Sequence, residues 1–398
     1  MAGLNETPNA ERVQIGFFGC RNAGKSSIVN AVTGQALSVV SDVKGTTTDP
    51  VKKAMELLPL GPVVIIDTAG LDDEGTLGEL RVQKTKQILA QIDIAVLVVD
   101  VRRGIRGADK ELIAELTARQ IPYLIVQNQC DLLETVPQNE GNQIYVSAKT
   151  GMNIHALKEQ LANLLPESEK KRQLIEDLLH PNDCVVLVCP IDESAPKGRL
   201  ILPQQQTIRA ILDADAVAVV TKETELSAAL ERLHPALVVT DSQALGTVQN
   251  IVPDAVPLTT FSILMARYKG FLETAVQGIA AAKHLHDGSR ILVAEGCTHH
   301  RQCGDIGTVK IPRLMQKYCG CSLQFEACSG GSFPEDLSDY DMVIHCGGCM
   351  NTERDLQYRR NLAAAQGIPF TNYGIALAQM TGTLERTLRC FPQIHMML

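Results

Sequence analysis

A phosphate-binding loop stands close to the start of the chain. The run Gly19-Cys20-Arg21-Asn22-Ala23-Gly24-Lys25-Ser26 places two glycines at the required spacing before a Lys-Ser pair. The glycines allow the backbone N–H groups to face phosphate oxygens, Lys25 reaches the outer phosphates, and the Ser26 hydroxyl binds Mg²⁺. The predicted nucleotide contacts of this loop are Gly19, Asn22, Ala23, Gly24, Lys25, Ser26 and Ser27.

Two further segments are suited to sensing the terminal phosphate. Asp67-Thr68-Ala69-Gly70 follows an apolar run, where Asp67 can hold Mg²⁺ through water and the Gly70 N–H can contact the terminal phosphate. Gly45–Asp49 contains Thr47, whose hydroxyl can complete the Mg²⁺ shell. Loops that grip a terminal phosphate become ordered with a triphosphate and relax after hydrolysis. The sequence therefore predicts a nucleotide switch.

The residues expected at the base indicate guanine. Asp131 ends the run Asn128-Gln129-Cys130-Asp131, and its carboxylate can accept from two guanine N–H groups that adenine does not offer together. Ser147-Ala148-Lys149 follows the next apolar run and can present a backbone N–H to guanine O6. We predict GTP as the nucleotide, with a base site formed by Asn128, Asp131, Ser147, Ala148 and Lys149.

A second group of reactive side chains lies far downstream. Cys297-Thr298-His299 follows one apolar run, and His345-Cys346-Gly347-Gly348-Cys349 follows another. Because the carboxyl ends of parallel strands share one edge of a sheet, these motifs should converge. Three thiolates with nearby histidines can bind zinc or iron–sulfur, and the long, asymmetric spacing favours a 4Fe–4S cluster with one exchangeable position. The other candidates rank lower because they lack placement at a strand end: Cys303, Cys319, Cys321 and Cys328.

The elements that must hold these residues are α/β throughout. Residues 13–168 alternate helical patterns with apolar strands, of which the clearest are Val13–Phe18, Val63–Asp67, Ile94–Val99, Tyr123–Gln127 and Ile144–Val146. Such alternation predicts a mostly parallel sheet with helices on both faces. Two smaller α/β sets follow, and Thr352 with Asp355 should cap a helix after the second cysteine motif. We expect domains at 1–170, 180–260 and 261–398.

Composition limits the possible partners. The net charge of −8 argues against a nucleic-acid groove, which needs clustered Lys and Arg. No apolar run is long enough to span a bilayer, and the polar stretch Met1–Arg12 lacks the apolar region of a secretory signal. We therefore expect a cytoplasmic protein without a membrane partner. In a reducing compartment, the 12 cysteines favour metal binding or redox chemistry over disulfides.

The nucleotide-site elements together resemble the branch of translation-factor-like GTPases that contains the tRNA-modification and ribosome-assembly enzymes. That resemblance implies slow hydrolysis stimulated by K⁺, with the Asn22 side-chain carbonyl as a ligand of the ion. Glu79 matches the spacing of a water-activating carboxylate in a relative, and a solvated helix residue is the alternative. Catalysis would then involve Lys25, Thr47, Asp67, Gly70 and Glu79.

Two residues depart from the pattern of that branch. Gln129 stands where the family usually has Lys, which alters one packing surface for the base. Leu71 follows Gly70, where a Ras-like protein carries a catalytic Gln, so hydrolysis needs another arrangement.

Taken with the cysteine motifs, the whole chain resembles the HydF family, the maturation GTPases of iron-only (FeFe) hydrogenases. The discriminating part is Cys-x-His followed by His-Cys-x-x-Cys. The resemblance implies a scaffold that holds a 4Fe–4S cluster, receives or completes a diiron precursor made by two radical-SAM proteins, and delivers it to apo-hydrogenase. It places the cluster ligands at Cys297, Cys346 and Cys349, and matches His299 and His345 to the motif histidines.

The resemblance also implies that the middle domain forms a homodimer and that the C-terminal domain binds the cluster. We expect the strand near Val185–Val188 to be an edge strand that could extend a sheet across a two-fold axis. Two other functions remain open on the residues alone. One is an RNA- or ribosome-linked GTPase with a zinc-stabilised C-terminal domain, and the other is a redox sensor whose thiols control the GTPase.

Overall fold

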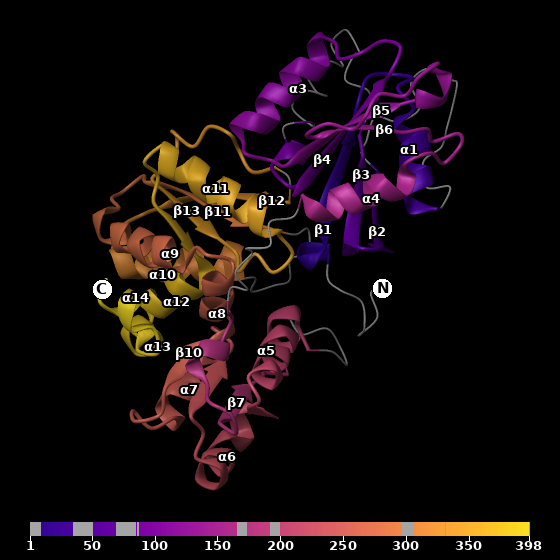
Figure 1. The fold of residues 1–398 in the computed structure, drawn as a ribbon. Helices are drawn as coiled ribbons and strands as arrows, with labels where there is room; N and C mark the ends of the chain where they lie inside the picture. Colours follow the sequence, from indigo (N-terminus) through magenta and orange to yellow (C-terminus); the bar gives the residue numbers. More distant parts are fainter. Residues whose placement is uncertain are drawn as a thin grey trace. The chain divides into compact units, whose positions relative to one another are not determined.

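The structure is a computed structural model of the chain. It describes residues 9–34, 51–68, 85, 87–164, 173–191, 200–296, 306–330 and 332–397. The chain forms two compact units, Met1–Lys170 and Lys171–Leu398, which are described separately (Figure 1). The predicted α/β architecture is confirmed in both units, since parallel sheets carry helices on their faces.

The first unit is built on one six-stranded sheet with the strand order β2-β3-β1-β4-β5-β6. Its strands are β1 (Val13–Phe18), β2 (Val51–Leu57), β3 (Gly61–Asp67), β4 (Ile94–Asp100), β5 (Tyr123–Asn128) and β6 (Gln143–Tyr145). The described helices that pack on it are α1 (Lys25–Thr33), α3 (Gly107–Ala118) and α4 (Ile154–Asn163). All strand pairs are parallel except β2 with β3, and this antiparallel edge was missed by the sequence analysis.

Side-chain alternation along the strands divides the core of this unit between the two faces of the sheet. Phe17 belongs to the cluster that α1 and α4 cover, whereas its neighbour Phe18 belongs to the cluster beneath α3. The central strand β4 is buried along its whole length, which explains its continuous apolar sequence, Ile-Ala-Val-Leu-Val-Val, before Asp100.

The second unit contains two four-stranded parallel sheets, with the orders β10-β9-β7-β8 and β12-β11-β13-β14. The first consists of β7 (Cys184–Val188), β8 (Val217–Thr221), β9 (Leu237–Thr240) and β10 (Leu258–Thr260). The second consists of β11 (Arg290–Glu295), β12 (Gln324–Ser329), β13 (Met342–His345) and β14 (Phe370–Asn372). The longer helices are α5 (Leu202–Asp213), α6 (Leu226–Leu233), α7 (Leu245–Ile251), α8 (Phe261–Tyr268), α9 (Leu272–Ala280), α10 (Ile311–Cys319), α11 (Glu353–Ala365), α12 (Tyr373–Met380) and α13 (Leu384–Leu388).

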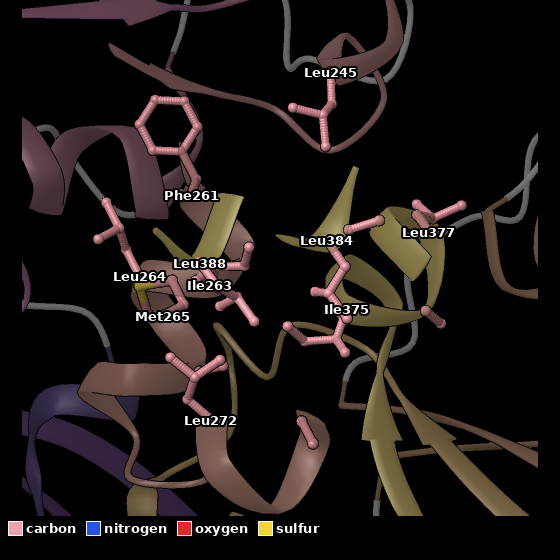
Figure 2. Packing of buried hydrophobic residues seen from close by; sticks show 14 of the residues in the cluster. Leu245, Phe261, Ile263, Leu264, Met265, Leu272, Ile375, Leu377, Leu384 and Leu388 are labelled. Carbon is pink, nitrogen blue, oxygen red and sulfur yellow. The ribbon is translucent and has the colours of Figure 1, made fainter. Parts of the chain in front are cut away.

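One hydrophobic core joins these two sheets. It runs from Leu174 to Phe391 without a break between the sheets. Figure 2 shows side chains of α7, α8, α9, α12 and α13 meeting in it, with Phe261, Leu264 and Met265 of α8 among them. The boundary that we expect at residues 260 and 261 lies where β10 passes directly into α8, and it stays a prediction.

The expectation that Val185–Val188 forms an edge strand is wrong. β7 pairs with β8 on one side and with β9 on the other, so its backbone groups are satisfied within the sheet. The edges of this sheet are β8 and β10. The buried Val-Val-Leu-Val run of β7 is typical of a central parallel strand, whereas β8 has exposed valines at 217 and 220.

In the described part of the chain, no helix has both the length and the apolar character needed to cross a membrane.

Candidate functional site

The predicted phosphate loop lies at the carboxyl edge of the first sheet. It connects β1 to α1. In the sheet, β2 and β3 lie on one side of β1 and β4, β5 and β6 lie on the other, so the strand order reverses at β1. Ligands of open α/β sheets bind at such a switch point. Gly24 has φ 85° at the start of α1, and a Cβ built on Gly19 would lie 2.3 Å from the Val98 carbonyl oxygen. Both positions therefore require glycine.

Three of the predicted catalytic and Mg²⁺ residues meet at this edge. The Lys25 ammonium lies 2.8 Å from Asp67 Oδ1, and the Ser26 hydroxyl lies 3.4 Å from Asp67 Oδ2. β3 brings Asp67 here because it pairs with β1 in parallel register, with Asp67 opposite Phe17. The buried Thr68 hydroxyl donates to the Phe17 carbonyl at 2.7 Å and fixes the end of β3. This cluster offers a cation, a hydroxyl and a carboxylate to a Mg²⁺-phosphate group.

The expected base-site segments are tied to the phosphate loop by one side chain. Asn128, at the end of β5, donates from Nδ2 to the Ala23 carbonyl at 3.0 Å, and its Oδ1 accepts from the Ala148 N–H at 3.2 Å. The Ser147 hydroxyl accepts from the Thr150 N–H and closes the turn that contains Lys149. Asp131 lies one turn after Asn128, in a short 3-10 helix. Asn128 thus links the phosphate loop to the segment Ser147–Lys149.

Several residues that the sequence analysis discussed at the nucleotide site are not among those that the structure describes. Thr47, Gly70, Leu71 and Glu79 lie outside the described residues. Asn22 is described at the exposed tip of the loop, in a left-handed conformation with φ 60°. Its predicted contact with K⁺ remains a prediction.

Sequence reasoning missed a polar cluster beside Gln129. Asp100 ends β4 and is only 3% exposed. Arg102 donates to it twice, from Nε to Oδ1 at 3.0 Å and from Nη2 to Oδ2 at 2.7 Å. The same Nη2 donates to Gln129 Oε1 at 2.8 Å. The hydrogen bond from Arg102 lowers the pKa of Asp100, so the pair is charged. An acidic residue at a strand end followed two residues later by arginine was the available signal.

In the second unit, the two strands that precede the predicted cysteine segments end side by side at the carboxyl edge of the second four-stranded sheet. β11 ends at Glu295 and β13 ends at His345, and the two strands pair directly, with Ala294 opposite His345. The Gly296 N–H lies 3.1 Å from Cys346 Sγ, and the Gly348 N–H lies 3.4 Å from the same sulfur. Cys297 and His299 lie outside the described residues, but Gly296 immediately precedes Cys297.

The loop around Cys346 has the donor set that an iron–sulfur ligand needs. Backbone N–H groups that point at a cysteine sulfur stabilise its thiolate form and tune a bound cluster. Gly348 has φ 65°, and a Cβ built on Gly296 would lie 1.7 Å from Asn351 Oδ1. The Thr352 hydroxyl accepts from the Asp355 N–H at 3.2 Å, which confirms the predicted helix cap. The surroundings of Cys346 therefore fit a thiolate ligand of a cluster.

A histidine that ligates a metal needs one free ring nitrogen, whereas both ring nitrogens of His345 have protein partners. Its ring is fully buried, Nε2 lies 3.0 Å from Arg359 Nη1, and Nδ1 lies 2.8 Å from the Cys346 carbonyl oxygen. Arginine only donates, so Nε2 accepts and Nδ1 carries the proton. Burial, together with the Arg359 charge, lowers the pKa of His345 to about 3. In this arrangement both ring nitrogens are bound to protein, and ligation by His345 would require one bond to break.

Two buried cations, Lys269 and Arg359, contact residues beside the Cys346–Cys349 loop. Arg359 on α11 pairs with Asp355 at 3.1 Å and donates to the Gly330 carbonyl at 2.7 Å. Lys269, after α8, is 3% exposed and donates to the Asn351 carbonyl at 3.1 Å. Burial raises the pKa of the Cys349 thiol, and the Lys269 charge opposes that rise. Positive charge is thus placed where thiolates would add negative charge.

The ranking of the remaining cysteines needs one correction. Cys328 does lie at a strand end, because it is the penultimate residue of β12 and pairs with Ala294. Burial raises the pKa of its thiol to about 11, which favours a neutral thiol. Cys319 and Cys321 precede β12 and so lie toward the opposite edge, and Cys303 is outside the described residues. Among the described residues, no group of three or more His, Cys, Asp or Glu side chains could hold a metal ion.

Comparison with protein families matches all three parts of the chain. Residues 14–129 match the 50S ribosome-binding GTPase model, so the first unit is a P-loop GTPase domain. Residues 174–270 match the hydrogen maturase F dimerization domain, and residues 273–390 match the hydrogen maturase F tetramerization domain. These last two models follow each other closely and together cover more than half of the chain.

Individual curated relatives match part of the chain. The tRNA modification GTPase MnmE of Nitrosomonas europaea is 34% identical over 156 residues, which are 38% of this chain and 34% of that protein. MnmE of Laribacter hongkongensis is 35% identical over 156 residues, with the same coverage. The chain therefore spans about a third of the length of these curated relatives.

Among solved structures, Aquifex aeolicus Era bound to GDP·AlF4⁻ has a TM-score of 0.35 and 18% identity, covering 55% of this chain and 97% of that one. A probable GTP-binding protein engB has a TM-score of 0.32 and 25% identity, covering 38% and 98%. With a GTPase domain followed by both domains of one maturase, the chain belongs to the hydrogen maturase F (HydF) family.

Proposed function

We propose that this protein is a GTP-hydrolysing scaffold that holds a 4Fe–4S cluster on Cys297, Cys346 and Cys349. On that cluster, or beside it, the protein completes a diiron precursor and passes it to apo FeFe-hydrogenase. The observation that carries the proposal is the contact between the Gly296 N–H and Cys346 Sγ, because it joins the ends of two strands that lead into the two cysteine motifs. The names of the two family models support the connection with hydrogenase maturation.

The cluster supplies an iron with an exchangeable position, and the protein supplies ligands and charge. Cys346 is oriented by two backbone N–H groups, and Cys349 lies in the same loop, which Lys269 and Arg359 support. These cations offset thiolate charge in a region where uncompensated charge would be costly. Thr352 and Asp355 fix the start of α11, so the loop has little freedom to move away.

We infer that the nucleotide site hydrolyses GTP slowly. Lys25, Ser26 and Asp67 form the phosphate and Mg²⁺ cluster, while Asn128 joins it to the base segments. We infer that Asn22 holds K⁺, that Thr47 completes the Mg²⁺ shell, that Gly70 contacts the terminal phosphate, and that Glu79 activates water. GTP would control partner exchange, while the cofactor carries the chemistry.

We further propose that the protein forms a homodimer through β8. This strand is an edge of its sheet, and Val217 and Val220 are 53% and 45% exposed on it. An exposed edge strand with apolar side chains is a ready template for pairing with a second copy. The family model that covers this sheet is described as a dimerization domain.

The test of the scaffold function is activation of apo FeFe-hydrogenase by this protein after anaerobic expression with the two radical-SAM partners. We expect wild-type protein to activate the hydrogenase and Cys346→Ser to fail. Cys390→Ser, which alters a half-buried cysteine outside the proposed site, serves as the control and should activate normally. Equal activation by wild type and Cys346→Ser would contradict the proposal.

A further inference from the structure

The first unit contains a hydrogen-bonded chain of three side chains, of which only Gln129 belongs to a predicted nucleotide-binding motif. It runs from the buried Asp100 carboxylate through the Arg102 guanidinium to the Gln129 amide. Arg102 is further fixed through its backbone N–H, which donates to Asp100 Oδ1 at 3.0 Å. The two side-chain bonds orient the guanidinium, and the backbone bond fixes the position of the residue that carries it.

This fixed guanidinium determines which way the Gln129 amide points. Arginine has donors only, so the group that it contacts on Gln129 must be the oxygen, Oε1. The amide nitrogen, Nε2, is therefore turned to the other side. On that side lies the phosphate loop, because a Cβ built on Gly24 would be 4.0 Å from Gln129 Nε2.

Gln129 stands between the two groups of residues that form the nucleotide site. Its neighbour Asn128 bonds to the Ala23 carbonyl in the phosphate loop and to the Ala148 N–H in the last base segment. Gln129 itself has a left-handed backbone with φ 66°, which directs its side chain away from the regular path of β5. An amide whose oxygen contacts a cation is polarised, and its N–H groups become stronger donors.

We propose that Arg102, oriented by Asp100, is a positioning residue for guanine-nucleotide binding, because it turns the Gln129 amide so that Nε2 donates into the nucleotide site. The inference rests on the proposed binding of GTP. Arg102 holds the amide, and Gln129 forms one wall between the base and the phosphate loop. Removing either side chain should weaken the binding of GTP and GDP together, since both share the guanosine part.

The test is the dissociation constant of fluorescently labelled GTP and GDP, with ATP as a competitor, for a set of variants of the full chain. Gln129→Ala keeps the Arg102–Asp100 pair and removes only the amide, so it is the variant least able to disturb folding. We expect Gln129→Ala and Arg102→Ala each to weaken GTP and GDP binding about tenfold, the usual effect of losing one hydrogen bond to a charged group.

The matched control is Arg103→Ala. Arg103 is the next residue, carries the same charge, and lies 3.8 Å from the same Asp100 carboxylate, but it makes no bond to Gln129 in the described structure. Its loss should change the dissociation constants less than about twofold. Equal losses for Arg102→Ala and Arg103→Ala would show a general charge effect and overturn the proposal.

A rescue variant tests whether Arg102 acts on nucleotide binding through the Gln129 amide. A lysine at position 129 carries its own charge and needs no polarisation, so Arg102→Ala/Gln129→Lys should regain most of the lost affinity. In the presence of Arg102, Gln129→Lys alone brings two cations together and should bind more weakly than the double variant. Failure of the double variant to recover, with thermal unfolding unchanged, would overturn the proposal, as would wild-type affinity in Arg102→Ala.

If the proposed function is wrong, the binding measurements give a different result from the one expected if only the Arg102 proposal is wrong. If wild-type protein binds neither GTP nor GDP, or prefers ATP, the assignment of the nucleotide is wrong before any variant is considered. If wild type prefers guanine nucleotides and Gln129→Ala binds them equally well, only the role of Arg102 and Gln129 is wrong.

Discussion

At the scale of single residues, two glycines in the cysteine region face very different surroundings. Gly296 is in contact with Asn351, whereas Gly347 has open space around its missing Cβ. Nothing in the sequence around them distinguishes these two positions. The structure shows that only Gly296 is required for packing, and it is also the residue whose N–H points at Cys346 Sγ.

Gly296→Ala should therefore disrupt the cysteine site, because its Cβ would fall 1.7 Å from Asn351 Oδ1. Overpacking of this kind costs about 1–3 kcal/mol of stability. We expect thermal unfolding of the second unit to shift to lower temperature and iron incorporation to fall. Gly347→Ala is the control and should retain wild-type stability and iron content; the idea fails if both alanines behave alike.

His345 gives a second test at this scale. Its two nitrogens bond to Arg359 and to the Cys346 carbonyl, so it positions the loop and does not ligate iron in this arrangement. His345→Gln, which can still accept from Arg359, should retain a cluster with an unchanged EPR signal, whereas His345→Leu removes the buried acceptor of Arg359 Nη1 and should destabilise the unit. Loss of the signal in His345→Gln, in a folded protein, would instead identify the histidine as a ligand.

At the scale of elements, the sequence predicted much of the first unit. The runs Val13–Phe18 and Tyr123–Gln127 coincide with β1 and β5 almost to the residue, because continuous burial requires continuous apolar sequence. The two failures have different causes. The antiparallel β2 is largely exposed, so it lacks such a run, and β7 was taken for an edge because strand order cannot be read from one strand's own residues.

An ion pair holds the short 3-10 helix Glu176–Leu178 at the start of the second unit. Asp177 lies in this helix, and Arg267 on α8 donates from Nη1 to its carboxylate at 2.7 Å. The hydrogen bond from Arg267 lowers the pKa of Asp177, so the folded pKa lies below the unfolded value of about 3.9. The stability that this pair contributes is complete above about pH 4 and is lost as the pH falls through the lowered pKa.

Asp177→Asn should consequently reduce the free energy of unfolding at pH 7 by about 1 kcal/mol, since both side chains keep some contact with water. The difference from wild type should shrink as the pH approaches 3. Urea unfolding at several pH values measures both effects. Asp254→Asn removes an acid that is 86% exposed beside Arg386 and is the control, for which we expect no change at any pH. A difference for Asp177→Asn that persists at acidic pH would show that charge pairing is not its cause.

The edge strand β8 is the element on which dimer formation should depend. Val217→Lys/Val220→Lys places charge on the strand, and charged side chains discourage pairing between edges. We expect light scattering after size-exclusion chromatography to give a lower particle mass for this variant. Leu212→Lys changes an equally exposed apolar residue on α5 and should leave the mass unchanged. An unaltered mass in the β8 variant would place the interface elsewhere.

At the scale of the whole molecule, the chain consists of a nucleotide unit and a second unit with one shared core. Lys25→Ala should abolish GTP turnover and leave iron binding intact, because the proposed ligands all lie in the second unit. Nucleotide hydrolysis and iron content, measured on the same preparation, check this. A protein that loses iron along with nucleotide turnover would show that the two sites are not separable.

What the sequence could not supply at this scale was the support beneath the cysteine loop. Lys269 follows α8, well before the first cysteine motif, and Arg359 lies on α11, the helix after the second motif; nothing in their local sequence marks them as buried. The burial of Lys269 and Arg359 becomes visible only when the elements that enclose them are placed. Asp100 was missed beside the nucleotide site although its place at a strand end, two residues before Arg102, was a signal in the sequence.

The most direct test of the account is EPR spectroscopy of anaerobically reconstituted and reduced protein. The wild type, Cys297→Ser and Cys328→Ser form the comparison, since Cys328 lies at the same sheet edge but has a pKa of about 11. We predict about four iron atoms per chain and a 4Fe–4S signal in wild type and in Cys328→Ser, and loss of both in Cys297→Ser. A full signal in Cys297→Ser would contradict the claim that the two strand ends share one cluster.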